Sequence, residues 1–270
     1  MTITDDLQEI AGKEKVNIFV GPRRVRFSVH RDVICQASYF FRAAFQGVFK
    51  EAKDGSVHMP KDDPVTFKRF LAWTYAGRLP ESRGTTSQRL LYDLYILAEK
   101  LCMNDLANRT IDRIKENHEH TFKIAGATDR NLKHIGHIYD HTSQRSPLRN
   151  LMLSIMGHDY YFAASKNLTG GSLVSREHLK KIWEVGQKHP DFYEDLFTLL
   201  LPIVPEQQHH QVLRPTQEQA LETLRSVLFS DARCSFHKHG AREFCYLYDQ
   251  DIQSGEEDGG SLSEQTSSAG

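Results

Sequence analysis

The pattern with the clearest chemical potential lies in the C-terminal part of the sequence, where cysteine and histidine residues are closely spaced. Zinc in structural sites prefers four nitrogen or sulfur ligands in a tetrahedral arrangement. A Cys-x2-His spacing places two ligands on one tight turn, and two histidines separated by one residue face the same side of an extended segment. The pattern therefore predicts one structural zinc ion within residues 233–248, held by Cys234, His237, His239 and Cys245. The alternative is a surface cluster without metal, because 14 histidines are enough for chance clustering.

No catalytic motif accompanies this cluster. The sequence has no glycine-rich phosphate loop, no Gly-x-Ser-x-Gly and no His-Glu-x-x-His motif. The run His118-Glu119-His120 lacks the pair of histidines four residues apart that a helical zinc-protease site needs. We therefore expect that the protein is not an enzyme. The alternative is an enzyme or metal-dependent protein that uses the C-terminal cysteine and histidine cluster.

Length and charge restrict the other classes of function. The chain has 270 residues, enough for one large domain or two smaller ones, and its net charge is -1. A dominant role in nucleic-acid binding usually needs a concentrated basic surface, so it is not expected. No apolar run approaches the roughly 20 residues that span a bilayer, and acidic residues precede the first apolar stretch, so we expect neither a membrane span nor a signal peptide. We expect a cytoplasmic or nuclear protein without a disulfide framework.

The elements that precede the cluster begin as strands and then become helices. Two segments that contain β-branched and aromatic residues, 16–20 and 24–28, flank a Gly-Pro break and predict a β-hairpin. A helical pattern follows over residues 31–49, in which Ser38 is expected to cap the second of two short helices. Residues 56–59 then predict a short strand.

Helical periodicity dominates the rest of the chain. The pattern predicts a helix between Asp63 and Gly77, an amphipathic helix through 90–101, a helix capped by Asn104, and further helices at about 129–140, 147–162, 176–188, 191–200 and 216–229. The fold class is therefore α+β followed by an all-helical part. The expected organisation is an N-terminal tail (1–13), an α+β domain (14–118), a helical domain (119–232), the metal segment (233–248) and a disordered acidic tail rich in serine and glycine (249–270).

Several residue runs within 14–118 occur in an order and at spacings that are specific to one family. They are Phe27–His30, Ile34–Phe41, Phe70–Gly77 and Leu94–Leu101, on elements in the order β-β-α-α-β followed by helices. This part of the chain resembles the BTB/POZ domain, a protein-interaction fold. The run Ile138–Thr142 resembles the helical region that follows the domain in fungal BTB proteins.

The resemblance assigns structural roles to four residues. His30 and Ser38 match signature positions that are structural in the family. Many BTB domains also carry a buried aspartate on the first strand that faces the arginine after the histidine, and the aligned positions here are Asn17 and Arg31. An amide can hydrogen-bond a guanidinium but does not neutralise it. This chain therefore departs from BTB domains whose partner binding depends on that charged pocket.

The resemblance also implies partners. A BTB domain of this kind is expected to form a dimer with itself or with another BTB protein and to present the helical domain. Phe49 and Glu51 fit the hydrophobic-x-Glu pattern by which some BTB domains contact the cullin scaffold of ubiquitin ligases, and the alternative places Phe49 in the core. A transcriptional scaffold is another version of the role. Loss of the predicted zinc is expected to leave the melting of the BTB domain unchanged.

Overall fold

The computed structural model describes residues 12, 14–79, 85–125, 132–165, 176–200, 222, 236–239 and 245. Four sequence predictions lie wholly or almost wholly outside the described residues: the N-terminal tail, Cys234, the helix at 216–229 and the acidic tail 249–270. No helix in the described ranges is both long enough and apolar enough to cross a bilayer.

The N-terminal part is built on a small mixed sheet. Strands β1 (Lys15–Val20) and β2 (Val25–His30) form an antiparallel hairpin, as the sequence predicts. Strand β3 (Ser56–Met59) pairs in parallel with β1, which gives the strand order β2-β1-β3. The hairpin turn includes Gly21 at φ 76°, a left-handed conformation that glycine adopts without strain.

Helices pack beside this sheet, and two of them begin at a side chain that accepts a hydrogen bond from a backbone N–H group. The predicted pair of short helices is present as α2 (Arg31–Ala37) and α3 (Tyr39–Gln46), followed by a further short helix, α4 (Lys50–Asp54). Ser38 accepts a hydrogen bond from the backbone of Phe41, which confirms its predicted capping role. Helix α5 (Pro64–Ala76) begins after Asp63, whose carboxylate accepts from the backbone N–H of Thr66 at 2.8 Å.

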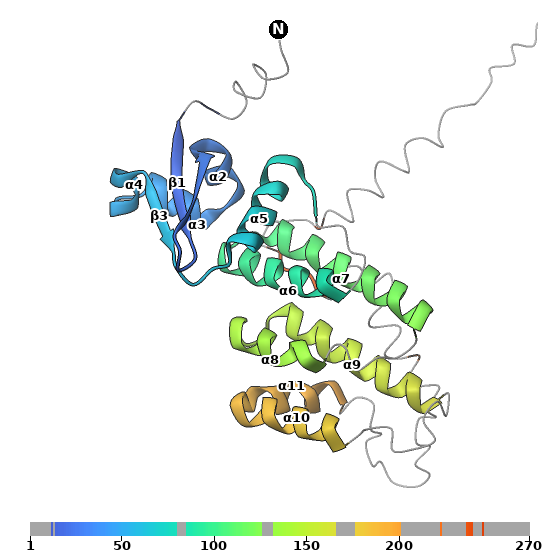
Figure 1. The fold of residues 1–270 in the computed structure, drawn as a ribbon. Helices are drawn as coiled ribbons and strands as arrows, with labels where there is room; N and C mark the ends of the chain where they lie inside the picture. Colours follow the sequence, from blue (N-terminus) through green and yellow to red (C-terminus); the bar gives the residue numbers. More distant parts are fainter. Residues whose placement is uncertain are drawn as a thin grey trace, which may run out of the picture.

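The remaining helices form stacked antiparallel pairs. Helices α6 (Thr85–Lys100) and α7 (Asn104–Ala125) form the first pair. They pack against the second pair, α8 (Leu132–His141) and α9 (Pro147–Ser165). The second pair packs against the third, α10 (Arg176–Lys188) and α11 (Pro190–Leu200). Figure 1 shows these pairs as successive layers leading away from the sheet. Helix α7 continues past residue 118 to Ala125, so it belongs both to the N-terminal domain and to the stack.

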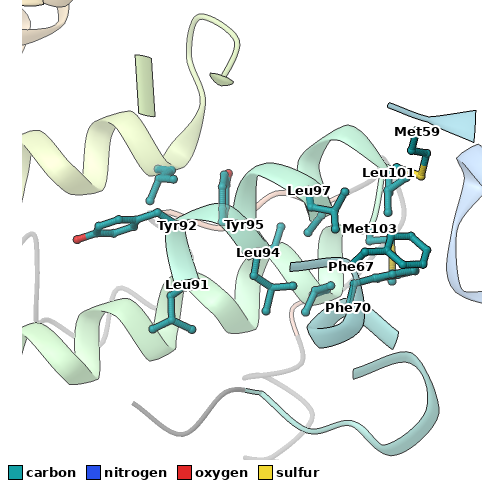
Figure 2. Packing of buried hydrophobic residues seen from close by; sticks show 14 of the residues in the cluster. Met59, Phe67, Phe70, Leu91, Tyr92, Leu94, Tyr95, Leu97, Leu101 and Met103 are labelled. Carbon is teal, nitrogen blue, oxygen red and sulfur yellow. The ribbon is translucent and has the colours of Figure 1, made fainter. Parts of the chain in front are cut away.

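One hydrophobic core joins the sheet to the stack. Figure 2 shows it along α6, from Tyr92 through Tyr95 and Leu97 to Leu101, with Phe67 and Phe70 of α5 beside the last turn. The same cluster includes strand residues and side chains of α9, so these layers share buried contacts. A smaller core holds α8, α9 and α11 together through Ile135, Tyr139, Leu153, Met156 and Phe192.

Candidate functional site

His30 has a structural environment in the fold. It ends β2, and both its backbone N–H and its ring Nδ1 lie within hydrogen-bond distance of the Tyr75 hydroxyl, at 2.9 and 3.0 Å. The two rings also meet edge to face, with centroids 5.9 Å apart. Tyr75 lies near the end of α5, so His30 connects the sheet to that helix. These contacts support a structural role for His30.

Ser38 connects two parts of the domain as well as capping α3. Its side chain is buried, and its hydroxyl donates to the carbonyl of Leu101 at 2.7 Å. Leu101 follows the last residue of α6. The serine hydroxyl therefore satisfies one of the carbonyl groups that a helix leaves without a partner at its C-terminus.

The positive charge of Arg31 is neutralised by a residue that the family resemblance does not indicate. Its guanidinium is 2.8 Å from both carboxylate oxygens of Glu14 and also donates to the carbonyl of Phe45. Asn17 is not its partner, because the hairpin register places Asn17 opposite Ser28. The same register continues from the Lys15–His30 pair to Glu14 and Arg31, and the backbone bond from Arg31 to Glu14 at 3.0 Å follows it.

The pair has an electrostatic consequence. The hydrogen bond that Arg31 donates to the Glu14 carboxylate raises the pKa of Arg31 above its usual value. The guanidinium therefore stays charged, and its charge is balanced within the domain. The resemblance to BTB domains predicts an arginine beside an amide that does not neutralise it, whereas the fold provides a carboxylate three residues earlier than Asn17.

Three large apolar side chains are exposed between the start of α3 and the start of α4. Tyr39 is 62% exposed, Val48 is 92% exposed and Phe49 is 58% exposed. Their neighbours Phe41 and Phe45 are buried in the core, so the aromatic residues of this region divide between the interior and the surface. Glu51 lies in the first turn of α4 and is exposed. The alternative that Phe49 is a core residue is therefore wrong. We refer to Tyr39, Val48 and Phe49 as the α3–α4 surface.

Three of the four predicted metal ligands are described, and the fold brings them together. One ligand atom from each of His237, His239 and Cys245 lies within 4.8 Å of the others. Nδ1 of His237 is 3.3 Å from Sγ of Cys245, and the cysteine is buried. Cys234 lies outside the described residues. This nitrogen and sulfur set suits zinc.

A carboxylate from a distant part of the chain orients this cluster. Nε2 of His237 is 3.0 Å from Oδ1 of Asp112, which lies on α7. A metal-bound histidine commonly donates its second ring N–H to a carboxylate, which fixes the tautomer and directs the free lone pair to the metal. With Asp112 at Nε2, Nδ1 of His237 would be the atom that binds an ion, and it lies on the side of Cys245. Sequence reasoning missed Asp112, since 125 residues separate it from His237.

The sequence comparison with protein families decides the nature of the N-terminal part. Residues 14–118 match the family described as BTB/POZ domain. These residues form a BTB/POZ domain. No curated protein matches the chain. A BTB domain implies protein–protein interaction or oligomerisation, and such domains are typically non-catalytic.

The cysteine and histidine segment docks on the BTB domain. The Asn108 amide of α7 donates to the carbonyl of Lys238 at 2.8 Å and accepts from its backbone N–H at 2.7 Å. The ammonium of Lys238 pairs with Glu99 on α6, and Phe236 is buried in the main core. The described part of the segment therefore shares a core with the BTB domain through Phe236. This contact argues against the expectation that the domain melts independently of the metal segment.

Proposed function

We propose that this protein is a non-enzymatic adaptor. Its BTB domain associates with a second copy or with another BTB protein, and the stacked helices are presented to a further partner. The observation that carries the proposal is the exposed α3–α4 surface on a BTB domain. Large apolar side chains in solvent favour association because contact with a partner removes them from water. The core that continues from the domain into α9 would hold the presented helices in a fixed orientation.

Association can be tested on the full chain by light scattering. We expect a dimer at micromolar concentration and a monomer for Val48→Asp, because an added charge on a 92% exposed residue disrupts a contact without disturbing the core. Val65→Asp is the matched control, since Val65 on α5 is 54% exposed and is not one of the residues of the α3–α4 surface. The full chain is needed because truncation at residue 118 would cut through α7. A monomeric wild type at high concentration would contradict the proposal.

Phe49 and Glu51 favour a cullin scaffold as one partner of the adaptor. The apolar side chain would fill a pocket of the partner, and the carboxylate would add a contact at the rim. Exposure of both side chains is the observation that supports this version. A transcriptional scaffold remains the other version of the adaptor role. An affinity pull-down followed by mass spectrometry tests both versions, since it shows cullin, chromatin factors or neither.

Phe49→Ala is expected to abolish capture of the cullin while leaving the unfolding free energy almost unchanged. A surface position contributes within about 0.5 kcal/mol, whereas a core phenylalanine would cost about 3–5 kcal/mol. Chemical denaturation and a pull-down on the same preparations give both quantities. Phe45→Ala provides the contrast, because Phe45 is 1% exposed and should lose stability. Failure of the wild-type protein to capture any cullin would end this version.

We also propose one structural zinc ion bound by His237, His239 and Cys245, with Cys234 as the fourth ligand. The grouping of three donors and the Asp112 carboxylate behind His237 support the assignment. A full set of protein ligands leaves no open position for water, so the metal would stabilise structure rather than catalyse a reaction. The ion would hold the segment against α6 and α7 of the BTB domain.

A further inference from the structure

A second group of metal-binding side chains lies between α7 and α9. His118 belongs to α7, and His158 and Asp159 are consecutive residues of α9. All three are buried, with exposed fractions of 7%, 1% and 7%. Burying histidine and aspartate side chains away from water costs free energy unless they bind a partner. A cluster of such residues between two helices therefore indicates a specific interaction.

The nitrogen–oxygen distances within the group fit metal ligands better than direct hydrogen bonds. Nε2 of His118 is 3.5 Å from Oδ1 of Asp159, and Nδ1 of His158 is 3.6 Å from the same oxygen. These distances are longer than a good nitrogen–oxygen hydrogen bond, which is about 2.7–3.2 Å. Two ligands bound at about 2.0–2.1 Å in a tetrahedron lie roughly 3.3 Å apart, close to the observed spacing. One ligand atom from each residue lies within 4.8 Å of the other two.

We propose that His118, His158 and Asp159 form a second metal site, which takes zinc or a similar divalent transition ion. Two imidazoles and one carboxylate suit such an ion, whereas magnesium and calcium prefer an all-oxygen set. Three protein ligands leave one position for water or another donor. The proposal does not depend on association of the BTB domain.

The site would join the BTB domain to the helices that follow it. Helix α7 is the last helix of the matched domain and α9 belongs to the stack, so one ion would cross-link the two parts. This site is separate from the first cluster, which is formed by His237, His239 and Cys245. Asp112 and His118 are six residues apart on α7, which corresponds to about 9 Å along the helix axis and a different face.

The test uses the untagged full chain with Cys234→Ser and Cys245→Ser, which remove both thiolates of the first cluster. The protein is stripped with a chelator and titrated with cobalt(II) and with zinc. We expect one equivalent to bind, and the cobalt form to show the comparatively intense visible d–d bands of a four-coordinate ion without sulfur-to-metal charge transfer. Adding His158→Ala should abolish this binding. Adding His134→Ala, which removes a buried histidine of α8 outside the group, should leave it unchanged.

Two results would overturn the proposal. One is a folded double-serine protein that binds no cobalt or zinc, in which case the group is only a buried polar cluster. The other is metal that is retained in full after His158→Ala. If His158→Ala fails to fold by circular dichroism, Asp159→Asn replaces it. This nearly isosteric change should weaken zinc binding at least roughly tenfold, and unchanged affinity would count against the site.

Discussion

Arg149→Met is expected to lower the unfolding free energy by about 3–5 kcal/mol, the typical cost of removing one partner from a buried ion pair. The Arg149 side chain is 4% exposed and forms an ion pair with Asp191 of α11. Its guanidinium also donates to the carbonyls of Tyr139 at 3.2 Å and Thr142 at 2.6 Å, at the end of α8. One side chain therefore ties α9 to both neighbouring helices. Methionine retains the apolar stem but leaves these oxygens without their donor.

Lys188→Met is the matched control for this effect. The ammonium of Lys188 is 2.6 Å from Asp140, but the lysine side chain is 64% exposed. Water screens such a pair, so its loss should cost no more than about 1 kcal/mol. Urea denaturation of the full chain measures both variants. Equal losses would show that the Arg149 network contributes no more than a surface contact.

Replacing Cys234 and Cys245 with serine is expected to remove the zinc of the first cluster and to destabilise the whole protein. A ligand present at 100 times its dissociation constant stabilises the folded state by about 2.7 kcal/mol, and this contribution would be lost. The effect should reach the BTB domain, because Phe236 is buried in its core and Asn108 binds the backbone of Lys238. Elemental analysis and thermal melts of the untagged protein measure the metal and the stability.

Asp112→Asn gives an intermediate test of the same cluster. The amide keeps the shape of the carboxylate near His237 but removes its charge, so zinc affinity should fall by roughly 10–100-fold while the ion can still bind. Asp105→Asn is a control on the same helix, because Asp105 forms an exposed pair with Arg109. A wild-type protein that carries zinc only at the α7–α9 site would contradict the first assignment and leave the second intact.

Features that depend on neighbouring residues were predictable from the sequence. The hairpin, the cap at Ser38, the cap at Asp63 and the helices of the stack follow from turn residues, capping side chains and periodicity within a few positions. The residue runs of the BTB signature are similarly local, and they led to the correct domain. The exposure of Phe49 was left open, because its apolar side chain is compatible with either a core or a surface.

The sequence by itself determined the BTB domain, its α+β class, the helices that follow and the grouping of His237, His239 and Cys245. Only the tertiary structure decided which distant residues meet these groups. The hairpin register places Glu14 beside Arg31. The tertiary fold places His237 next to Asp112 of α7, and the packing of α7 against α9 places His118 next to Asp159. Capping and periodicity act over a few residues and leave a mark in the local sequence. Contacts across 17 or 125 positions are set by strand register and helix packing, which no short pattern encodes.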